Sequence, residues 1–268
     1  MLEALSYPFM QRALIGGALA GFLLSYYGAF VVQRRLAFMG SGLAHAAFGG
    51  VALGILLNTQ PLWVAVPFTA VVAVAIVAVR ERTALAEDTS IGVFFAVSMA
   101  LGIVFLSLKQ GYAGDAFAIL YGSILSVTPA DLWVTAIVAA ATVATFTLWS
   151  QWAYATFDKT LARADRLRVT AADYLLNVAI AVVVVVSIKV VGILLIAAFL
   201  VLPGAAARLL SGTFRGMTLW SVALGISSAV AGLFLSYFAN LPSGATIILL
   251  QAFIFVVALG AGRALRSG

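Results

Sequence analysis

The sequence contains no cysteine and few charged residues. Of its 268 residues, 9% are Asp, Glu, Lys or Arg, whereas an ordinary soluble domain has about 25%. The absence of cysteine excludes disulfides, thiolate metal ligands and cysteine nucleophiles. A soluble fold of this length could not cover its surface with so few charges. The same composition excludes a disordered chain and argues against a nucleic-acid partner.

Hydrophobic residues make up 64% of the chain, against about 45–50% in a soluble domain. This composition predicts an all-α polytopic membrane protein. At about 20 apolar residues per span, the chain has room for eight or nine transmembrane helices and for no sizeable soluble domain. We therefore expect residues 1–268 to form a single transmembrane domain.

Apolar runs predict the positions of the membrane spans. Lys189 and Gly192 interrupt the long run 174–202, which we divide into two spans; without this division the count is eight. A shorter run, Phe117–Val127, cannot cross alone and predicts a re-entrant or interfacial segment. The nine predicted spans are Ala13–Val32, Ala37–Leu57, Leu62–Val79, Ile91–Leu108, Leu132–Leu148, Tyr174–Ile188, Val190–Leu202 (with a possible extension to Leu210), Met217–Phe238 and Ala245–Gly260.

The distribution of Lys and Arg predicts the orientation. With nine spans, 12 of the 15 basic residues fall on the side that holds the loop 33–36. Cytoplasmic loops carry an excess of Lys and Arg. We therefore expect a multi-pass protein of the cytoplasmic membrane, with its N-terminus outside and its C-terminus in the cytoplasm.

His45 is the only histidine and lies near the middle of the second predicted span. An ionisable side chain at that depth is a candidate functional residue, and imidazole is a common ligand of divalent metals. Ser41 lies one helical turn earlier on the same face and is a candidate lining residue. The alternative is a structural histidine that is hydrogen-bonded to a neighbouring helix. Ser41 and His45 point in parallel and no acid lies nearby, which argues against a serine hydrolase and against an enzyme.

Three other polar residues lie within or beside the predicted spans. We expect Lys189 to extend its ammonium group to a membrane surface. Asn177 and Gln251 are expected to form hydrogen bonds between helices rather than to bind a ligand.

Two segments on the basic side are candidate contacts for a soluble partner. Residues 152–173 alternate charged and apolar side chains and predict a short amphipathic helix at the membrane surface. Residues 202–216 predict a small-residue helix followed by a tight turn. The alternative for both is a lipid-surface anchor. The chain has no phosphate-binding P-loop and no acidic residue within its predicted spans, so a transporter built from it would depend on an external energy source.

Several segments together resemble the permease subunits of zinc, manganese and iron ABC importers. In that family an aspartate usually occupies the position of Ser41, so the resemblance implies a weak metal site here, with His45 acting alone or paired with a second His45 across a dimer axis. The segments that carry the resemblance are Arg34–Gly50, Tyr121–Leu125, Phe157-Asp158 with Ala162, Val191–Leu202 with Pro203 and Ala206–Leu210, and Leu241–Thr246.

The resemblance implies the fold of the cobalamin- and siderophore-type (type II) importers and a homodimer with its pathway on the two-fold axis. Two cytoplasmic ATPase subunits would bind ATP, and an extracytoplasmic protein would deliver the divalent metal; this chain would hold no cofactor of its own. Segments near 150–172 and 202–216 would couple to the ATPase, through Asp158 in the first and Pro203, Arg208 and Arg215 in the second. Alternatives are a permease for a metal chelate such as a siderophore, and a secondary transporter without an ATPase.

Overall fold

The structure, a computed structural model, describes residues 7–83, 85–109 and 127–267. Within these ranges the chain is helical and contains no strand, as the composition predicts. Eight of the described helices are long and apolar enough to cross a membrane, and α11 is a shorter apolar helix. The predicted segment Phe117–Val127 lies outside the described residues except for Val127, as does the motif Tyr121–Leu125. The helices are α2 (Pro8–Gln33), α3 (Ala37–Leu56), α4 (Pro61–Arg82), α5 (Glu87–Leu108), α7 (Pro129–Ala144), η2 (Thr145–Leu148), α8 (Trp149–Phe157), α9 (Lys159–Ala164), α10 (Val169–Val191), α11 (Ile193–Leu210), α12 (Phe214–Ala239) and α13 (Ser243–Ser267).

The long apolar run is divided, as predicted, but the break lies at Gly192 rather than at Lys189. Gly192 has φ 88°, a left-handed conformation that glycine adopts without steric cost. Helix α10 therefore ends at Val191 and α11 starts at Ile193. Pro203 lies inside α11, which continues to Leu210, the later of the two predicted ends.

The prediction of a short amphipathic surface helix within residues 152–173 is wrong. Helix α8 continues the fifth span through η2 and ends at Phe157, and Trp152 within it is buried. Asp158 then caps α9, which is only six residues long. Helix α10 already starts at Val169, so Asp173 belongs to a long apolar helix rather than to a surface segment.

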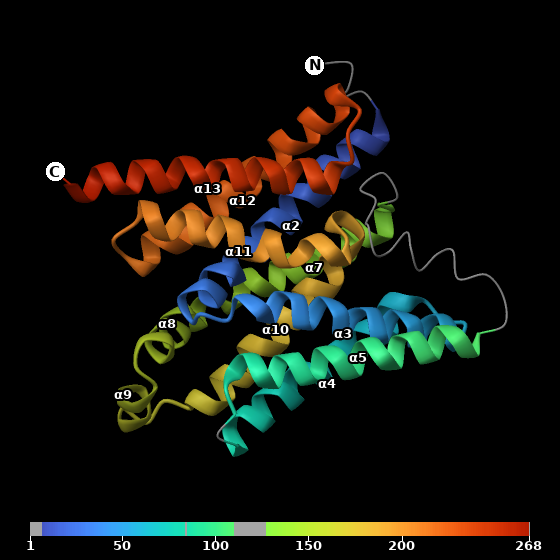
Figure 1. Ribbon diagram of the computed structural model, residues 1–268, viewed down its shortest axis with the longest axis horizontal. Helices are drawn as coiled ribbons and strands as arrows, with labels where there is room; N and C mark the ends of the chain where they lie inside the picture. Colours follow the sequence, from blue (N-terminus) through green and yellow to red (C-terminus); the bar gives the residue numbers. More distant parts are fainter. Residues whose placement is uncertain (1–6, 84, 110–126, 268) are drawn as a thin grey trace.

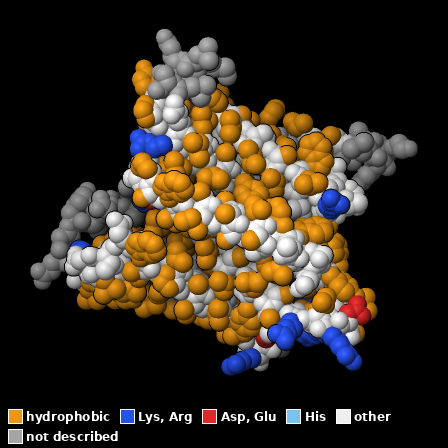
Figure 2. Space-filling view, turned by 180° about the vertical axis from the view of Figure 1, so that it is seen from behind, with side chains coloured by type: hydrophobic (Ala, Val, Ile, Leu, Met, Phe, Trp, Pro, Cys, Tyr) orange, Lys and Arg blue, Asp and Glu red, His pale blue; other side chains and the backbone are white. Residues whose placement is uncertain are grey.

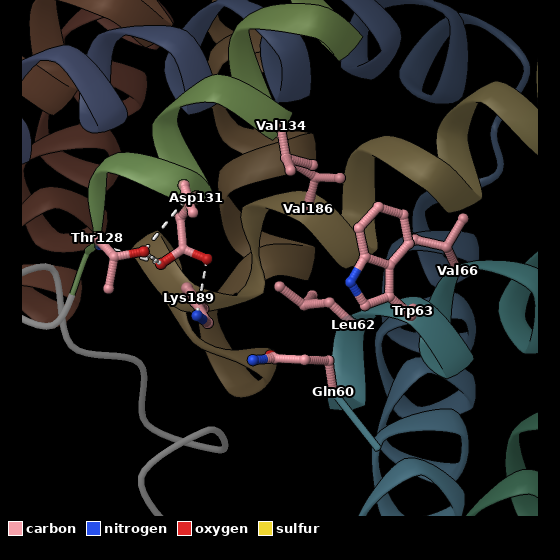
Figure 3. A pocket seen from close by; sticks show the side chains of 10 residues that line it. Gln60, Leu62, Trp63, Val66, Thr128, Asp131, Val134, Val186 and Lys189 are labelled. Atoms are coloured by element: carbon pink, nitrogen blue, oxygen red, sulfur yellow. Dashed lines mark hydrogen bonds and ion pairs between the residues drawn. The ribbon is translucent and has the colours of Figure 1, made fainter.

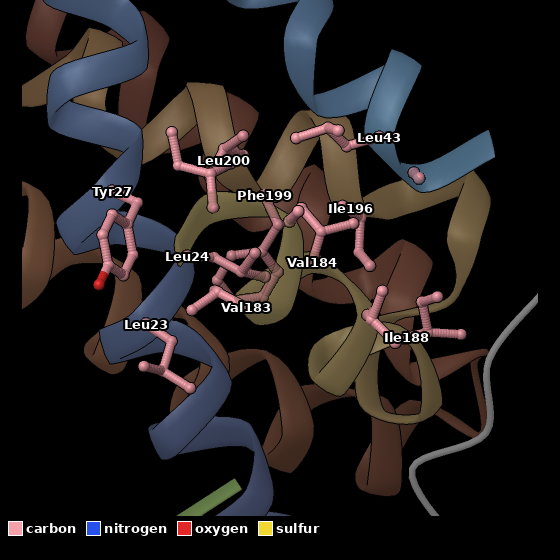
Figure 4. Close-up of a cluster of buried hydrophobic side chains, with 14 of the residues drawn as sticks. Leu23, Leu24, Tyr27, Leu43, Val183, Val184, Ile188, Ile196, Phe199 and Leu200 are labelled. Atoms are coloured by element: carbon pink, nitrogen blue, oxygen red, sulfur yellow. The ribbon is translucent and has the colours of Figure 1, made fainter. Parts of the chain in front are cut away.

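The core of the bundle lies between α2, α3, α10 and α11. Large apolar side chains from these four helices interlock there, among them Leu24, Leu43, Val184 and Phe199 (Figure 4). Helix α12 packs on α2, where a Cβ atom added to Gly21 would come within 2.7 Å of the Gly225 carbonyl oxygen. Small residues at such crossings let helices approach closely in lipid.

The loops between helices gather at two ends of the bundle (Figure 1). The turns α2–α3, α4–α5 and α11–α12 lie at the same end as α9, and α13 finishes there, whereas α2 starts at the opposite end. From behind, the surface is largely hydrophobic, and most of its visible basic side chains cluster at the lower right corner, where α9 and the α4–α5 turn lie (Figure 2). We call the end with α9 the basic end and the other the opposite end.

Candidate functional site

His45 lies nine residues into α3 and is half-buried. Its Nδ1 atom is 2.8 Å from the Ser41 carbonyl oxygen. A carbonyl can only accept, so Nδ1 must carry the proton, and in the neutral imidazole Nε2 then has a free lone pair. The ring also makes an edge contact with Phe95 of α5, with centroids 4.5 Å apart. No hydrogen bond joins His45 to another of the described helices, which argues against the structural alternative.

One accessible stripe runs along α3. Phe38, Ser41 and His45 share a face at spacings of three and four residues. Each retains exposure, whereas every other residue from Met39 to Ala52 is buried. Helix α5 beside this stripe is also open, with Val93 and Val97 about half exposed. The structure therefore brings Ser41 and His45 together on a face that the described helices leave uncovered.

A complete metal centre is not formed by the residues that the structure describes. No three His, Asp or Glu side chains among them lie close enough to share an ion. The Ser41 backbone carbonyl accepts a hydrogen bond from His45 Nδ1. This bond fixes the orientation of the ring, as the outer hydrogen-bond partners of metal-bound histidines do. The stripe on α3 can therefore offer one nitrogen ligand, with the remaining positions open to water or to ligands from elsewhere.

A buried ionic cluster at the basic end was not predicted from the sequence. Asp173 of α10 is 2% exposed, and its carboxylate contacts three cations. The distances are 2.6 Å to Nη1 of Arg34, 2.8 Å to Nη2 of Arg80 and 3.1 Å to Nζ of Lys159. Glu87 adds a contact of 3.1 Å to Arg80. We call these five residues the Asp173 cluster.

The Asp173 cluster joins five segments of the chain, namely the turn before α3 and helices α4, α5, α9 and α10. Arg34 belongs to the turn before α3, Arg80 to the last turn of α4 and Lys159 to the start of α9. Arg34 is further held by the Thr156 hydroxyl, at 2.9 Å from Nε. The sequence signal was an aspartate close to a basic loop, but the wrong boundary of α10 placed it at the surface.

A second ion pair lies at the opposite end. Lys189 Nζ of α10 is 2.7 Å from Asp131 Oδ1 of α7, and Asp131 also closes a capping box with Thr128. The pair lines a cavity of about 310 Å³ together with Gln60 and Trp63 of the α3–α4 region (Figure 3). Lys189, which the sequence predicts to extend to a membrane surface, is 34% exposed here and also has a specific carboxylate partner.

The two other predicted polar contacts differ in outcome. Gln251 Nε2 of α13 is 3.0 Å from Ser228 Oγ of α12, which confirms a hydrogen bond between helices. The prediction for Asn177 is wrong. Its Nδ2 atom donates to the Asp173 carbonyl at 2.7 Å within α10, because a short amide side chain readily reaches the carbonyl one turn earlier.

The predicted coupling residues fall into three environments. Arg208, in the last turn of α11, and Arg215, the second residue of α12, are exposed on either side of the turn 211–213. Pro203 is buried within α11. Asp158 is exposed at the other segment, where it accepts hydrogen bonds from the amides of Thr160 and Leu161 at 2.9 and 2.8 Å. Asp158 therefore has a structural task as the cap of α9.

Comparison with known proteins gives similarity over nearly the whole chain. A sequence model of the ABC 3 transport family matches residues 6–261. The chain is 33% identical to the manganese transport system membrane protein MntC of Listeria monocytogenes, over 96% of this chain and 92% of that protein. It is 30% identical to the high-affinity zinc uptake system membrane protein ZnuB of Haemophilus influenzae, over 94% of this chain and 97% of that protein.

Solved structures share the fold. A chain of PsaBC from Streptococcus pneumoniae, solved in complex with Fab, superposes with a TM-score of 0.84 at 31% identity, covering 95% of this chain and 92% of that one. An inward-facing putative metal-chelate type ABC transporter gives a TM-score of 0.77 at 12% identity, with 94% and 86% covered. The expected architecture of metal-chelate type permeases is therefore confirmed.

Proposed function

Because the chain belongs to the ABC 3 transport family, we propose that it is the permease subunit of an ATP-driven importer that carries divalent metal ions such as manganese or zinc into the cell. The observation that carries this proposal is similarity over the whole length to MntC and ZnuB, which are named for manganese transport and zinc uptake. The metal ion is the cargo, and the chain itself is not an enzyme.

His45 is proposed to line the path of the metal. Its Nε2 lone pair lies on the accessible stripe of α3, and Nδ1 is occupied by the Ser41 carbonyl. A single imidazole replaces only part of an ion's hydration shell, so the site would bind weakly and release readily, as a transport path requires. Ser41 adds no charge to it.

We further propose a homodimer, which the position of that stripe supports. An ionisable side chain in a membrane protein normally faces the protein interior or a water-filled cavity rather than lipid. A second copy packed on the open face of α3 and α5 would enclose His45 and bring a second imidazole to the same axis. The half-exposed Val93 and Val97 would then lie in that interface.

Energy would come from separate ATPase subunits at the basic end. The chain has no P-loop, and the turn 211–213 at the basic end exposes Gly212 and Thr213. Arg208 beside that turn, with Asp158 at the head of α9, would contact the ATPase. Pro203, buried in α11, would act only through the packing of that helix. In this proposal the basic end would face the cytoplasm, and the opposite end would face outside, toward an extracytoplasmic metal-binding protein.

Reconstitution with the ATPase tests this function. The purified permease and ATPase in proteoliposomes, with the delivery protein added outside, should take up Mn²⁺ or Zn²⁺ only when ATP is enclosed with the ATPase. Arg208→Glu should keep ATP hydrolysis but lose most metal uptake, because like charges at the contact would uncouple the two. Uptake driven by an ion gradient without ATP would overturn the proposal, and uptake of a siderophore complex but not of free ions would point to a chelate permease.

A further inference from the structure

A groove of about 500 Å³ lies between α2, α12 and the junction of η2 with α8. Most of its walls are aromatic or aliphatic. Phe22 and Tyr26 of α2 meet Phe146 of η2, with ring centroids 6.3 and 5.0 Å from the Phe146 ring. Phe146 and Leu219 are about half exposed or more, so the groove is open to the outside of the bundle.

One cation stands in this apolar groove. Arg215 lines it together with Thr218, Leu219 and Val222, which follow at spacings of three, four and seven residues and so form one stripe of α12. From Arg215 to Val222 the stripe extends about 10 Å along the helix axis. Arg215 lies at the basic end, and Trp149 beside it stacks on Phe214 at 5.5 Å. The groove therefore has a charged mouth and an apolar floor.

The charge of Arg215 has no partner among the described residues. Helices α2, α8 and α12 and the segment η2 contain no Asp or Glu. By contrast, Arg34 and Arg80 at the same end are both paired with Asp173. An anionic group would complement Arg215, and the apolar stripe below it fits a hydrocarbon chain on the same molecule.

We propose that this groove is a binding site for an anionic phospholipid, with the phosphate on Arg215 and one acyl chain along Leu219 and Val222 against the rings of α2 and η2. Basic pockets between transmembrane helices at the cytoplasmic side are suited to anionic headgroups, and Trp and Tyr lie at the same membrane level. This assigns Arg215 to the lipid and leaves Arg208 as the arginine that faces the ATPase.

Native mass spectrometry of the purified full-length permease, titrated with phosphatidylglycerol or phosphatidylcholine, tests the site. The native protein should bind phosphatidylglycerol more tightly, and Arg215→Gln should reduce that preference about fivefold, the effect of one basic residue at a membrane surface. Arg208→Gln is the matched control, because it removes the same charge outside the groove, and it should leave the preference unchanged. Equal loss in both variants, or no loss in Arg215→Gln, would overturn the proposal.

A second variant tests whether an acyl chain lies in the groove while the charge of Arg215 is kept. Val222→Phe fills the floor beneath an intact Arg215 and should weaken binding of both phospholipids; unchanged binding would mean that no acyl chain lies there. Inorganic phosphate at millimolar concentration should not displace phosphatidylglycerol, and full displacement would make the site a phosphate site. If Arg215→Gln does not fold, Val222→Phe and the phosphate competition decide between these outcomes.

Discussion

The two ends of the bundle hold their helices in different ways. At the basic end, Asp173 is 2% exposed and binds cations from three segments. At the opposite end, Asp131 pairs with a single cation, Lys189, which is 34% exposed, and otherwise caps its own helix. Asp131 lies in the first turn of α7, whereas Asp173 is the fifth residue of α10, so the two aspartates have different positions and different tasks.

This difference indicates which end is fixed and which is held loosely. Removing one member of a buried charge network leaves the others uncompensated in a low-dielectric environment, whereas an exposed pair is screened by water and contributes little. The Asp173 cluster ties the root of α3, which carries His45, to α4, α9 and α10. Movement at α9 would therefore be transmitted to α3, while the Asp131–Lys189 pair can open at small cost.

Labelling gives an all-or-none test of which end faces the cytoplasm. The chain has no cysteine, so single cysteines can be added without background. Thr59→Cys is at the opposite end and exposed, and it should react with a membrane-impermeant maleimide in intact cells. Gly212→Cys is at the basic end, where an added side chain meets nothing within 4 Å, and it should react only after permeabilisation. The reverse pattern would invert the proposed orientation.

Asp173→Asn is expected to have the largest effect on stability. The amide cannot neutralise Arg34, and the loss for breaking a buried charge cluster is about 3 kcal/mol or more. Thermal unfolding in detergent should show a lower midpoint and less assembled complex. Glu87→Gln is the matched control, because Glu87 contacts Arg80 from a side chain that is 37% exposed, and it should cost less than about 1 kcal/mol. Equal losses would show that Asp173 is not the centre of the cluster.

His45→Ala should lower metal uptake by at least about tenfold, the loss that follows removal of even an outer partner of a metal ligand. Binding of the ATPase should not change, because His45 makes no contact at the basic end. Ser41→Ala is the control that keeps the backbone carbonyl, and it should transport at nearly the native rate. Ser41→Asp should retain metal more strongly, because it adds a charge one helical turn from His45 on the same face of α3 in a low-dielectric site. Native uptake by His45→Ala would make the histidine structural.

Sequence reasoning located the features that depend on local pattern. Apolar runs gave the spans, and spacing placed Ser41 and His45 on one face of α3. The sequence did not predict the features that depend on contacts between distant segments. Asp173 was assigned to a surface helix because its segment is rich in charge, yet three cations from distant segments bury it. Arg208 and Arg215 looked equivalent in one basic loop, and only the packing of α12 on α2 placed Arg215 in an apolar groove.

Asp131→Asn should have the smallest effect. The substitution removes the charge attraction to Lys189, but Lys189 is partly exposed and can be solvated instead, so the loss of stability should be less than about 1 kcal/mol. The asparagine oxygen can still accept from the Thr128 amide and hydroxyl, and its backbone amide still donates to the Thr128 hydroxyl, which preserves the cap of α7. Thermal unfolding of Asp131→Asn beside Asp173→Asn, with Lys189→Met as the matched partner variant, measures the contrast directly. A loss of stability at Asp131 as large as that at Asp173 would mean that both ends of the bundle are fixed. The helices would then need another flexible element to let movement at α9 reach α3.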